Sequence, residues 1–155
     1  MTVHLLCGLN GAGKSTYARE LARSRLAVRL SLDEWMIRLY GLPFDDPEYG
    51  KRVEPCRDLI WTSAQEVLRC GVDVILDWNC WSRRLRRRWA DRASAVPAEV
   101  VVHYVDVPVS VAIQRARQRV DPSSHAIDEA GVRHLAGLFE PPTADEALRI
   151  VTVCR

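Results

Sequence analysis

The residues with the clearest chemistry form a glycine-rich turn near the start of the chain. Residues 8–15 read GLNGAGKS, which fits the pattern G-x-x-x-x-G-K-[ST] at every fixed position. Such glycines let successive backbone N–H groups point inward at phosphate oxygens, and the following helix directs its positive end at the same anion. Lys14 is expected to reach the outer phosphates, and the Ser15 hydroxyl to bind Mg²⁺. The predicted nucleotide-binding residues are Gly8, Asn10, Gly11, Ala12, Gly13, Lys14, Ser15 and Thr16.

Asp77 closes an apolar run that begins at residue 72. The segment VDVILD fits the Walker B pattern, in which four or five apolar residues precede an aspartate. A carboxylate at this position helps to hold Mg²⁺, usually through the water shell of the ion. The alternative is an aspartate that only caps the turn after the strand. We therefore predict a metal site formed by Ser15 and Asp77.

Asp33 follows another predicted strand, at residues 27–32, and precedes a short helix expected over residues 34–40. At the carboxyl end of a parallel strand, it suits a general base that accepts the proton of an attacking hydroxyl or orients that hydroxyl. It could equally be the N-cap of the following helix, or serve in both roles. Arg38 is a candidate for binding a substrate anion, with a plain surface arginine as the alternative.

Arg115, Arg117 and Arg119 lie at the end of a helix expected over residues 109–120. Arg115 and Arg119 are four residues apart and share one helix face. Phosphoryl transfer needs positive charge on the migrating group, so we favour an arginine-bearing lid over about residues 115–128. The alternative is a solvated helix end where arginine suits the helix dipole. The predicted catalytic residues are Lys14, Asp33, Arg115 and Arg119.

A helix expected over residues 82–95 is rich in arginine and has tryptophans nearby. Arginine with interleaved aromatic side chains is typical of a platform for single-stranded nucleic acid. However, Leu85 and Trp89 mark a core-facing stripe, so a salt-bridged surface face is the preferred interpretation. Trp78 and Trp81 could instead line a substrate pocket. The arginines are Arg83, Arg84, Arg86, Arg87, Arg88 and Arg92. The predicted substrate-binding residues are Asp33, Trp35, Arg38 and Trp78.

Strand and helix patterns alternate along the chain. This alternation predicts an α/β fold with a parallel sheet covered by helices on both faces, in a single domain over residues 1–155. The predicted strands are residues 3–7, 27–32, 72–77, 99–108 and 149–153. The predicted helices are residues 14–24, 34–40, 54–69, 82–95, 109–120 and 128–139. The predicted loops include residues 41–50, 121–127 and 140–146.

Composition narrows the possible classes of protein. The chain has 155 residues, 48% of them hydrophobic, which suits one globular domain. A net charge of +2 is too small to indicate nucleic-acid or membrane binding by itself. Five cysteines without a C-x-x-C pair predict a reduced, cytoplasmic protein. No apolar run approaches the length of a membrane span, and the glycine-rich turn leaves no room for a signal peptide ahead of it.

Six segments, GLNGAGKST, LSLDEW, VILDWNCWSR, YVDVP, QRARQR and FEPPTADE, together resemble one family. This family is the small bacterial P-loop proteins labelled AAA-family ATPases, whose layout is similar to kinases. Its relatives include polynucleotide 5′-kinase, chloramphenicol phosphotransferase and the zeta toxins. The resemblance implies a three-layer α/β/α P-loop NTPase fold, with five parallel strands in the kinase-type order 2-3-1-4-5. It also implies the use of ATP (or GTP) and Mg²⁺.

The resemblance implies roles for individual residues. The proposed base of these kinases is the aspartate after the second strand, which corresponds to Asp33, and their lid arginines correspond to Arg115 and Arg119. One position departs from the pattern: polynucleotide kinases place an arginine three residues after that aspartate, where this chain has Met36. The nearest arginine is Arg38. FEPPTADE is similar to the family's C-terminal signature, and we assign it no chemical role from sequence.

Together these features predict an ATP- and Mg²⁺-dependent kinase that phosphorylates a hydroxyl of a small molecule, such as an antibiotic, a nucleoside or a sugar. One rival is a polynucleotide 5′-hydroxyl kinase, in which Arg84, Arg87 and Arg88 would bind nucleic acid with strong salt dependence. A second rival is a nucleotide-binding regulator with slow hydrolysis and no acceptor. The kinase is favoured because Asp33 lies on the acceptor side and the chain leaves no room for a partner-binding domain.

Overall fold

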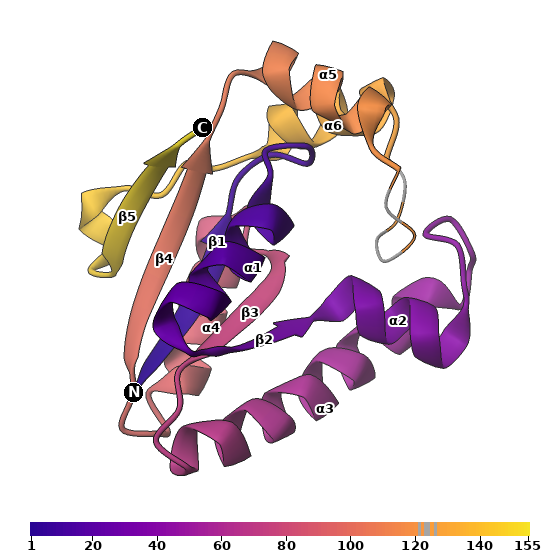
Figure 1. Cartoon of the computed structure of the whole chain (residues 1–155). Coiled ribbons are helices and arrows are strands. Elements are labelled where there is room, and N and C mark those ends of the chain that lie inside the picture. The colour runs from indigo at the N-terminus through magenta and orange to yellow at the C-terminus, as the bar shows by residue number, and fades with distance from the viewer. Residues whose placement is uncertain (121, 123–124, 126) are drawn as a thin grey trace.

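The computed structural model describes residues 1–120, 122, 125 and 127–155. Its five strands form one parallel sheet in the order β2-β3-β1-β4-β5 (Figure 1). The α/β class and the strand order implied by the family resemblance are thereby confirmed. The strands are β1 (Thr2–Cys7), β2 (Val28–Ser31), β3 (Val74–Asn79), β4 (Glu99–Asp106) and β5 (Arg149–Cys154).

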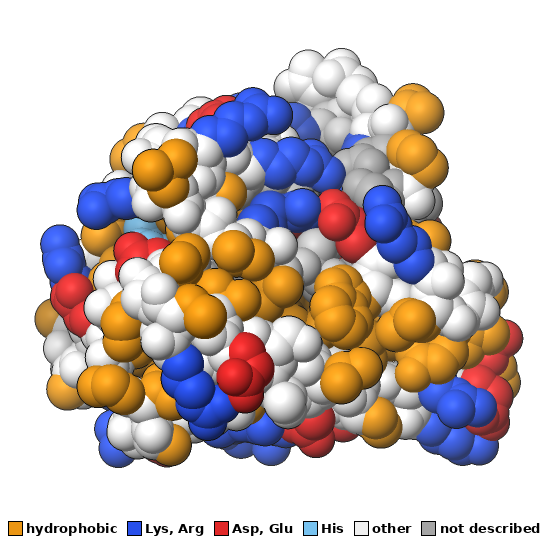
Figure 2. Space-filling model, turned by 60° about the horizontal axis from the view of Figure 1, so that its bottom comes forward, with side chains coloured by type: hydrophobic (Ala, Val, Ile, Leu, Met, Phe, Trp, Pro, Cys, Tyr) orange, Lys and Arg blue, Asp and Glu red, His pale blue; other side chains and the backbone are white. Residues whose placement is uncertain are grey.

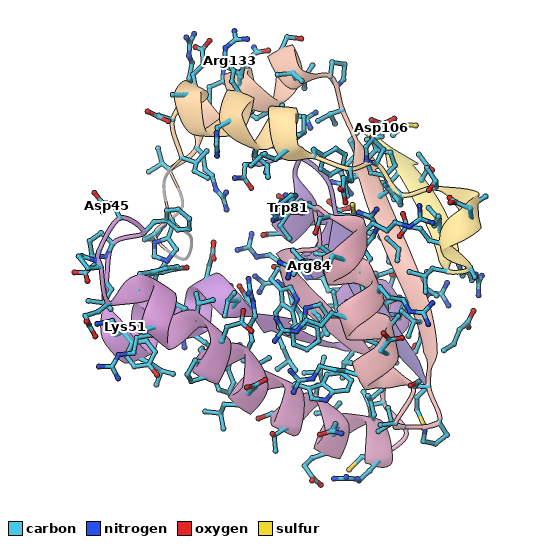
Figure 3. All side chains as sticks on the ribbon, turned by 180° about the vertical axis from the view of Figure 1, so that it is seen from behind. Asp45, Lys51, Trp81, Arg84, Asp106 and Arg133 are labelled. Carbon is cyan, nitrogen blue, oxygen red and sulfur yellow. The ribbon has the colours of Figure 1, made fainter. Side chains whose placement is uncertain are left out.

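Helices cover both faces of this sheet (Figures 1 and 3). They are α1 (Lys14–Arg25), α2 (Leu32–Tyr40), α3 (Tyr49–Arg69), α4 (Arg83–Ala93), α5 (Val109–Gln118) and α6 (Glu129–Leu138). Side chains of β1 alternate between the faces: Leu5 joins a core formed with α3 and α4, whereas Leu6 packs against α1. Across the described residues, every helix is too short or too polar to cross a bilayer.

Three predicted boundaries are wrong. Helix α3 begins at Tyr49 rather than near residue 54, so Pro55 lies inside it and removes a single backbone donor. Strand β3 extends to Asn79, so Asp77 lies inside the strand and not at its end. The segment predicted as a loop over residues 140–146 ends in a 3₁₀ turn, Ala144–Glu146.

Helix α4 begins where the sequence predicts, at the N-cap Ser82, whose Oγ accepts a hydrogen bond from the Leu85 N–H at 3.3 Å. One of its arginines, however, does not lie on the solvent-exposed face of the helix. Arg86 is fully buried and forms a bidentate pair with Glu146, with N–O distances of 2.6 and 2.8 Å. It also donates to the Cys80 carbonyl oxygen at 3.1 Å and to the Sγ of Cys7 at 3.6 Å, at the end of β1.

The FEPPTADE segment holds this buried pair in place. The Glu140 carbonyl oxygen accepts a hydrogen bond from Arg86 at 2.9 Å, and the Glu140 carboxylate accepts one from the Arg83 N–H at 2.6 Å. Thr143 and Glu146 form a capping box for the 3₁₀ turn. The segment therefore has a structural role, since it fixes the start of α4 and neutralises its buried arginine beside the strand that leads into the glycine-rich turn.

Candidate functional site

A cavity of about 940 Å³ lies at the carboxyl ends of the strands, where α/β sheets bind ligands. One side of it is formed by the glycine-rich turn and the start of α1, and the other by the first turn of α2 and the start of α3. The end of α5 and β3 complete the walls. Figure 2 shows basic side chains gathered in the upper middle of one face of the molecule, beside an acidic side chain. The cavity joins the predicted donor and acceptor sides.

The glycine-rich turn approaches two neighbouring elements so closely that its glycines are required. Gly8 and Gly11 have φ values of +147° and +84°. A Cβ added at Gly11 would lie 2.1 Å from the Ala112 carbonyl oxygen, and one at Gly8 would lie 2.6 Å from that of Val105. Gly8 and Ala12 are buried in the turn, away from the cavity. The predicted residues that line the cavity are Asn10, Gly11, Gly13, Lys14, Ser15 and Thr16.

The start of α1 is suited to an anion. Its N-cap is Gly13, which offers no side chain to the first N–H groups, and its first turn holds no acidic residue. The Lys14 ammonium donates hydrogen bonds to the carbonyl oxygens of Gly8 and Leu9 at 3.0 and 2.8 Å. Burial lowers the pKa of Lys14 to about 8, and the nearby carboxylate of Asp77 opposes this shift only in part. The lysine is held within the turn, beside the phosphate position.

This pKa predicts that nucleotide affinity depends on pH. Bound phosphate favours protonated Lys14, so the affinity should be nearly constant up to about pH 7, fall to about half at pH 8 and then fall by up to about tenfold per pH unit as free Lys14 loses its proton. Titration calorimetry with a non-hydrolysable ATP analogue and Mg²⁺ measures this. Lys14→Arg is the control, because a guanidinium stays charged to pH 10 and should give a flat profile. A flat profile in the wild-type protein would contradict the prediction.

Ser15 and Asp77 lie together at the end of this turn. The Ser15 Oγ donates a hydrogen bond to Asp77 Oδ1 at 3.2 Å. Arg29 of β2 donates to Asp77 Oδ2 at 2.7 Å and to Glu34 at 2.8 Å. Because Asp77 lies within β3, the alternative that it only caps the turn after the strand is wrong. Arg29 escaped prediction, although a charged residue in the middle of a short alternating strand is a sign of a buried partner.

The oxygen atoms of Ser15 and Asp77 fit Mg²⁺, which binds proteins through few oxygen ligands and takes the others from phosphate and water. Among the described residues, His, Cys, Asp and Glu form no group of three that could hold a metal by themselves. Ser15 and Asp77 would therefore hold an ion at this position together with phosphate oxygens of the nucleotide.

Asp33 lines the cavity from the first turn of α2. The N-cap of this helix is Ser31, whose Oγ accepts a hydrogen bond from the Glu34 N–H at 3.4 Å, so the N-cap alternative for Asp33 is wrong. Burial raises the pKa of the Asp33 carboxyl group, while the charge and backbone N–H of His125 and the charge of Arg119 act in the opposite direction. Asp33 therefore lines the cavity and does not cap the helix.

Arg115 and Arg119 both line the cavity from the end of α5. Arg115 donates a hydrogen bond to the Ala12 carbonyl oxygen at 3.2 Å, which ties α5 to the glycine-rich turn. The charge of Arg119 contributes to the pKa shifts of both Lys14 and Asp33. Arg115 of α5 and Arg119 directly after it therefore line the cavity that the predicted phosphate site and the predicted base share.

The predicted lid, at about residues 115–128, is described only in part. The residues of the lid outside the described set are 121, 123, 124 and 126. Arg117 pairs with Glu129 on the exposed side of α5 and α6. The His125 ring meets the Tyr49 ring edge-on, with centroids 5.0 Å apart. The described part of this segment thus reaches across the cavity to the start of α3.

Among the predicted substrate-binding residues, Asp33 and Trp78 line the cavity. Trp78 is 5% exposed and packs against Trp89 with ring centroids 4.8 Å apart. Trp35 and Arg38 are not in the cavity wall. Two and five residues beyond Asp33, they are rotated from it by about 200° and 140° around the helix axis. Trp35 packs instead against the core.

The acceptor half contains wall residues that the sequence did not reveal. They are Phe44, Tyr49 and Arg57, on the loop before α3 and on α3 itself, and Asn79 at the end of β3. Figure 3 shows Trp81, also part of the wall, at the start of α4, with Asp45 and Lys51 on the far side of the molecule beside the Phe44 loop. Phe44 and Tyr49 were missed because the segment dense in Gly, Pro and Asp hides the true start of α3, whereas Trp81 lies in the cavity wall as the sequence suggested.

Four arginines of α4 are engaged in ion pairs. This observation confirms the preferred interpretation of a salt-bridged surface for four of the six arginines in that segment. The pairs are Arg83–Asp145, Arg87–Asp91, Arg88–Glu54 and Arg92–Asp58.

Comparisons with known proteins agree with the fold. A family model described as an AAA domain, AAA_33, matches residues 3–142. A search of curated proteins found no significant match. Among solved structures, the chain is similar to a protein from Chloroflexus aurantiacus that is assigned as a kinase without a named substrate. The TM-score is 0.76 at 19% identity, with 99% of this chain and 84% of that chain covered.

Two further structures are similar over 99% of this chain. A gluconokinase from Sinorhizobium meliloti has a TM-score of 0.61 at 18% identity, with 82% of its own chain covered. A sugar kinase from a Janibacter species has a TM-score of 0.66 at 18% identity, with 85% of its own chain covered. Identities this low establish a shared fold, and they leave the acceptor to be argued from the site.

Proposed function

The chain belongs to the AAA domain family AAA_33 and has the fold of P-loop kinases, and from that premise we propose that it is an ATP- and Mg²⁺-dependent kinase acting on a hydroxyl of a small molecule. The acceptor class extends to antibiotics, nucleosides and sugars. One observation carries the proposal: a single cavity contains Lys14, the arginines of α5 and Asp33. A nucleotide and a hydroxyl acceptor can therefore meet in one cavity.

In the proposed mechanism, Lys14 and the N–H groups of the glycine-rich turn bind the β- and γ-phosphates. Asp33 hydrogen-bonds the acceptor hydroxyl and takes its proton as the oxygen attacks the γ-phosphorus. The bond between that phosphorus and the bridging oxygen breaks, and ADP leaves. Arg115 and Arg119 stabilise the charge on the transferred group. Mg²⁺ held by Ser15 and Asp77 would supply further neutralisation of the phosphate oxygens.

Contacts over the acceptor side support a small molecule over a polynucleotide. Asp33 is half-buried, its carboxylate accepts a hydrogen bond from the His125 backbone N–H, and the His125 ring is packed on Tyr49. A kinase that phosphorylates the end of a nucleic acid needs an open, basic groove that leads to its catalytic aspartate. The exposed arginines Arg87 and Arg88 are instead paired with carboxylates. The names of two structural neighbours, gluconokinase and sugar kinase, are consistent with a hydroxylated acceptor.

Transfer of labelled γ-phosphate from ATP to a panel of hydroxyl compounds tests the proposed function. The wild-type protein should yield a phosphorylated acceptor, and Lys14→Ala should lose the transfer. Hydrolysis of ATP without any phosphorylated acceptor would contradict the kinase and favour the regulatory NTPase. Transfer only to the 5′ end of an oligonucleotide, with loss of binding in Arg84→Gln/Arg87→Gln/Arg88→Gln, would favour the polynucleotide kinase.

A further inference from the structure

Buried polar atoms without partners are concentrated in the walls of the cavity. Among the described residues, five buried side-chain nitrogen or oxygen atoms have no hydrogen-bond partner. Four of them belong to cavity residues: Arg57 Nε, Trp78 Nε1, Asn79 Oδ1 and His125 Nε2. The fifth, on His4, lies 3.7 Å from a carboxylate oxygen of Asp73 in the sheet. Well-packed interiors satisfy such groups, so their concentration here sets the cavity wall apart from the rest of the described interior.

These four groups come from three directions around the acceptor half. Arg57 extends from α3, Trp78 and Asn79 from β3, and His125 from the segment between α5 and α6. Arginine and tryptophan nitrogens can only donate, whereas the amide oxygen of asparagine accepts. These four atoms lie behind the accessible surface, so they mark a polar wall, and the partly exposed side chain of Arg57 is the one that a ligand can reach.

Arg57 has positive charge that its protein partner does not fully neutralise. Its NH1 group donates to Glu54 Oε1 at 2.5 Å, but the other oxygen of the same carboxylate accepts from Arg88 at 2.5 Å. One carboxylate thus serves two guanidinium groups. The side chain of Arg57 is 19% exposed, so water screens this excess charge only in part.

Tyr49 lies within electrostatic range of both Arg57 and Asp33, the proposed base. It is 7% exposed, and the charges of both Asp33 and Arg57 act on its hydroxyl, so it lies within electrostatic range of each. Burial raises the pKa of Tyr49 to about 12, which keeps the hydroxyl protonated and able to donate. Asp33, Tyr49 and Arg57 line the same cavity, so a small acceptor bound there has a carboxylate, a hydroxyl donor and a guanidinium in its walls.

We propose that Arg57 is an acceptor-binding residue that binds a carboxylate or phosphate group of the acceptor, while Asp33 receives its hydroxyl. The acceptor class is accordingly a hydroxylated small molecule with one anionic group. Arg57 supplies a paired N–H donor geometry suited to either anion. This inference rests on the proposed kinase function, because it assumes that Asp33 marks the acceptor hydroxyl.

The test compares matched acceptors and matched variants. Gluconate, glucose 6-phosphate and glucose, together with a nucleoside and its 5′-monophosphate, are titrated as acceptors with Mg²⁺ and labelled ATP, and their binding is measured with a non-hydrolysable ATP analogue. An anionic member should be preferred over its neutral counterpart. Arg57→Gln should raise its KM about 10- to 100-fold with a small change in kcat, and leave KM for neutral acceptors unchanged. The carboxylate and phosphate members separate the two sources of the anion.

Arg88→Gln is the matched control, because it removes the other partner of Glu54 but does not line the cavity. It should keep KM within about twofold, and both variants should have similar thermal midpoints. Phosphorylation of neutral acceptors alone, or an unchanged KM in Arg57→Gln, would overturn the anion site and leave the kinase standing. Binding of anionic compounds without phosphate transfer would overturn the kinase and retain the anion site. An absence of both binding and transfer would overturn both.

Discussion

Asp33→Asn should lower kcat for phosphate transfer by about 100- to 10,000-fold while leaving the Kd for ATP within about twofold. The amide keeps the shape of the side chain but cannot take the proton of the acceptor hydroxyl. In the proposed mechanism, Lys14 and the glycine-rich turn bind the nucleotide. The Asp33 carboxylate does not contribute to this binding, so the Kd should change little. Single-turnover transfer of labelled phosphate, with ATP binding measured separately, distinguishes the two quantities.

The pH profile gives an independent readout of the same residue. Burial raises the pKa of Asp33, and a base works only when ionised, so wild-type activity should fall on the acid side at a higher pH than for an ordinary aspartate. Asp33→Asn should remove this acid limb. Asp45→Asn, the same change on an exposed neighbouring loop, should leave both rate and profile intact. Full transfer by Asp33→Asn, with loss in Lys14→Ala, would show that the base is wrongly assigned.

The second large effect is expected on stability. Arg86→Ala should lower the free energy of unfolding by about 3–5 kcal/mol, because it leaves the carboxylate of Glu146 buried without its partner. Urea denaturation followed by tryptophan fluorescence measures the change. Arg84→Ala, an exposed residue of the same helix, is the control and should change it by at most about 0.5 kcal/mol.

A double substitution separates charge from shape at this position. Arg86→Met combined with Glu146→Leu removes both charges and keeps apolar volume, so it should recover most of the stability lost in Arg86→Ala. If Arg86→Ala were no less stable than Arg84→Ala, the pair would not be important for folding. If the double variant were as unstable as Arg86→Ala, the hydrogen bonds from Arg86 to the Cys80 and Glu140 carbonyl oxygens would matter more than the ion pair.

The donor side was predictable from sequence because its chemistry is local. The glycines, Lys14 and Ser15 lie within eight residues, and the strand before them and the helix after them are plain in the hydrophobic pattern. Asp77 was predictable for a similar reason, since a buried strand that ends in a carboxylate is unusual. Only its position within the strand was wrong, because β3 continues for two more residues.

The acceptor side was not predictable, because its residues meet only after folding. Arg57 and Tyr49 lie on a helix whose first turn is disguised by glycine, proline and aspartate, and their relation to Asp33 depends on how α3 packs. Trp35 was misleading for the opposite reason: it is close to Asp33 in sequence, but helix geometry turns it toward the core.

The sequence predicts helix α4 correctly but places Arg86 on its solvent-exposed face, whereas the side chain is buried. The buried residues Arg86, Trp89 and Ala93 have helical spacing, but a charged side chain is normally assigned to the surface. The burial becomes possible only because Glu146, sixty residues later in the chain, neutralises it. No pattern within the helix itself contains that information.

The distance in sequence between Arg86 and Glu146 has a consequence for protein synthesis. The Arg86 side chain also contacts Cys7, the residue that leads into the nucleotide-binding turn. A nascent chain that has not yet reached residue 146 holds an uncompensated guanidinium beneath that turn, and it also lacks β5 at the sheet edge. The surroundings of the predicted nucleotide site are therefore completed only after residue 146 has been synthesised, and chains truncated before Glu146 should lack a working site.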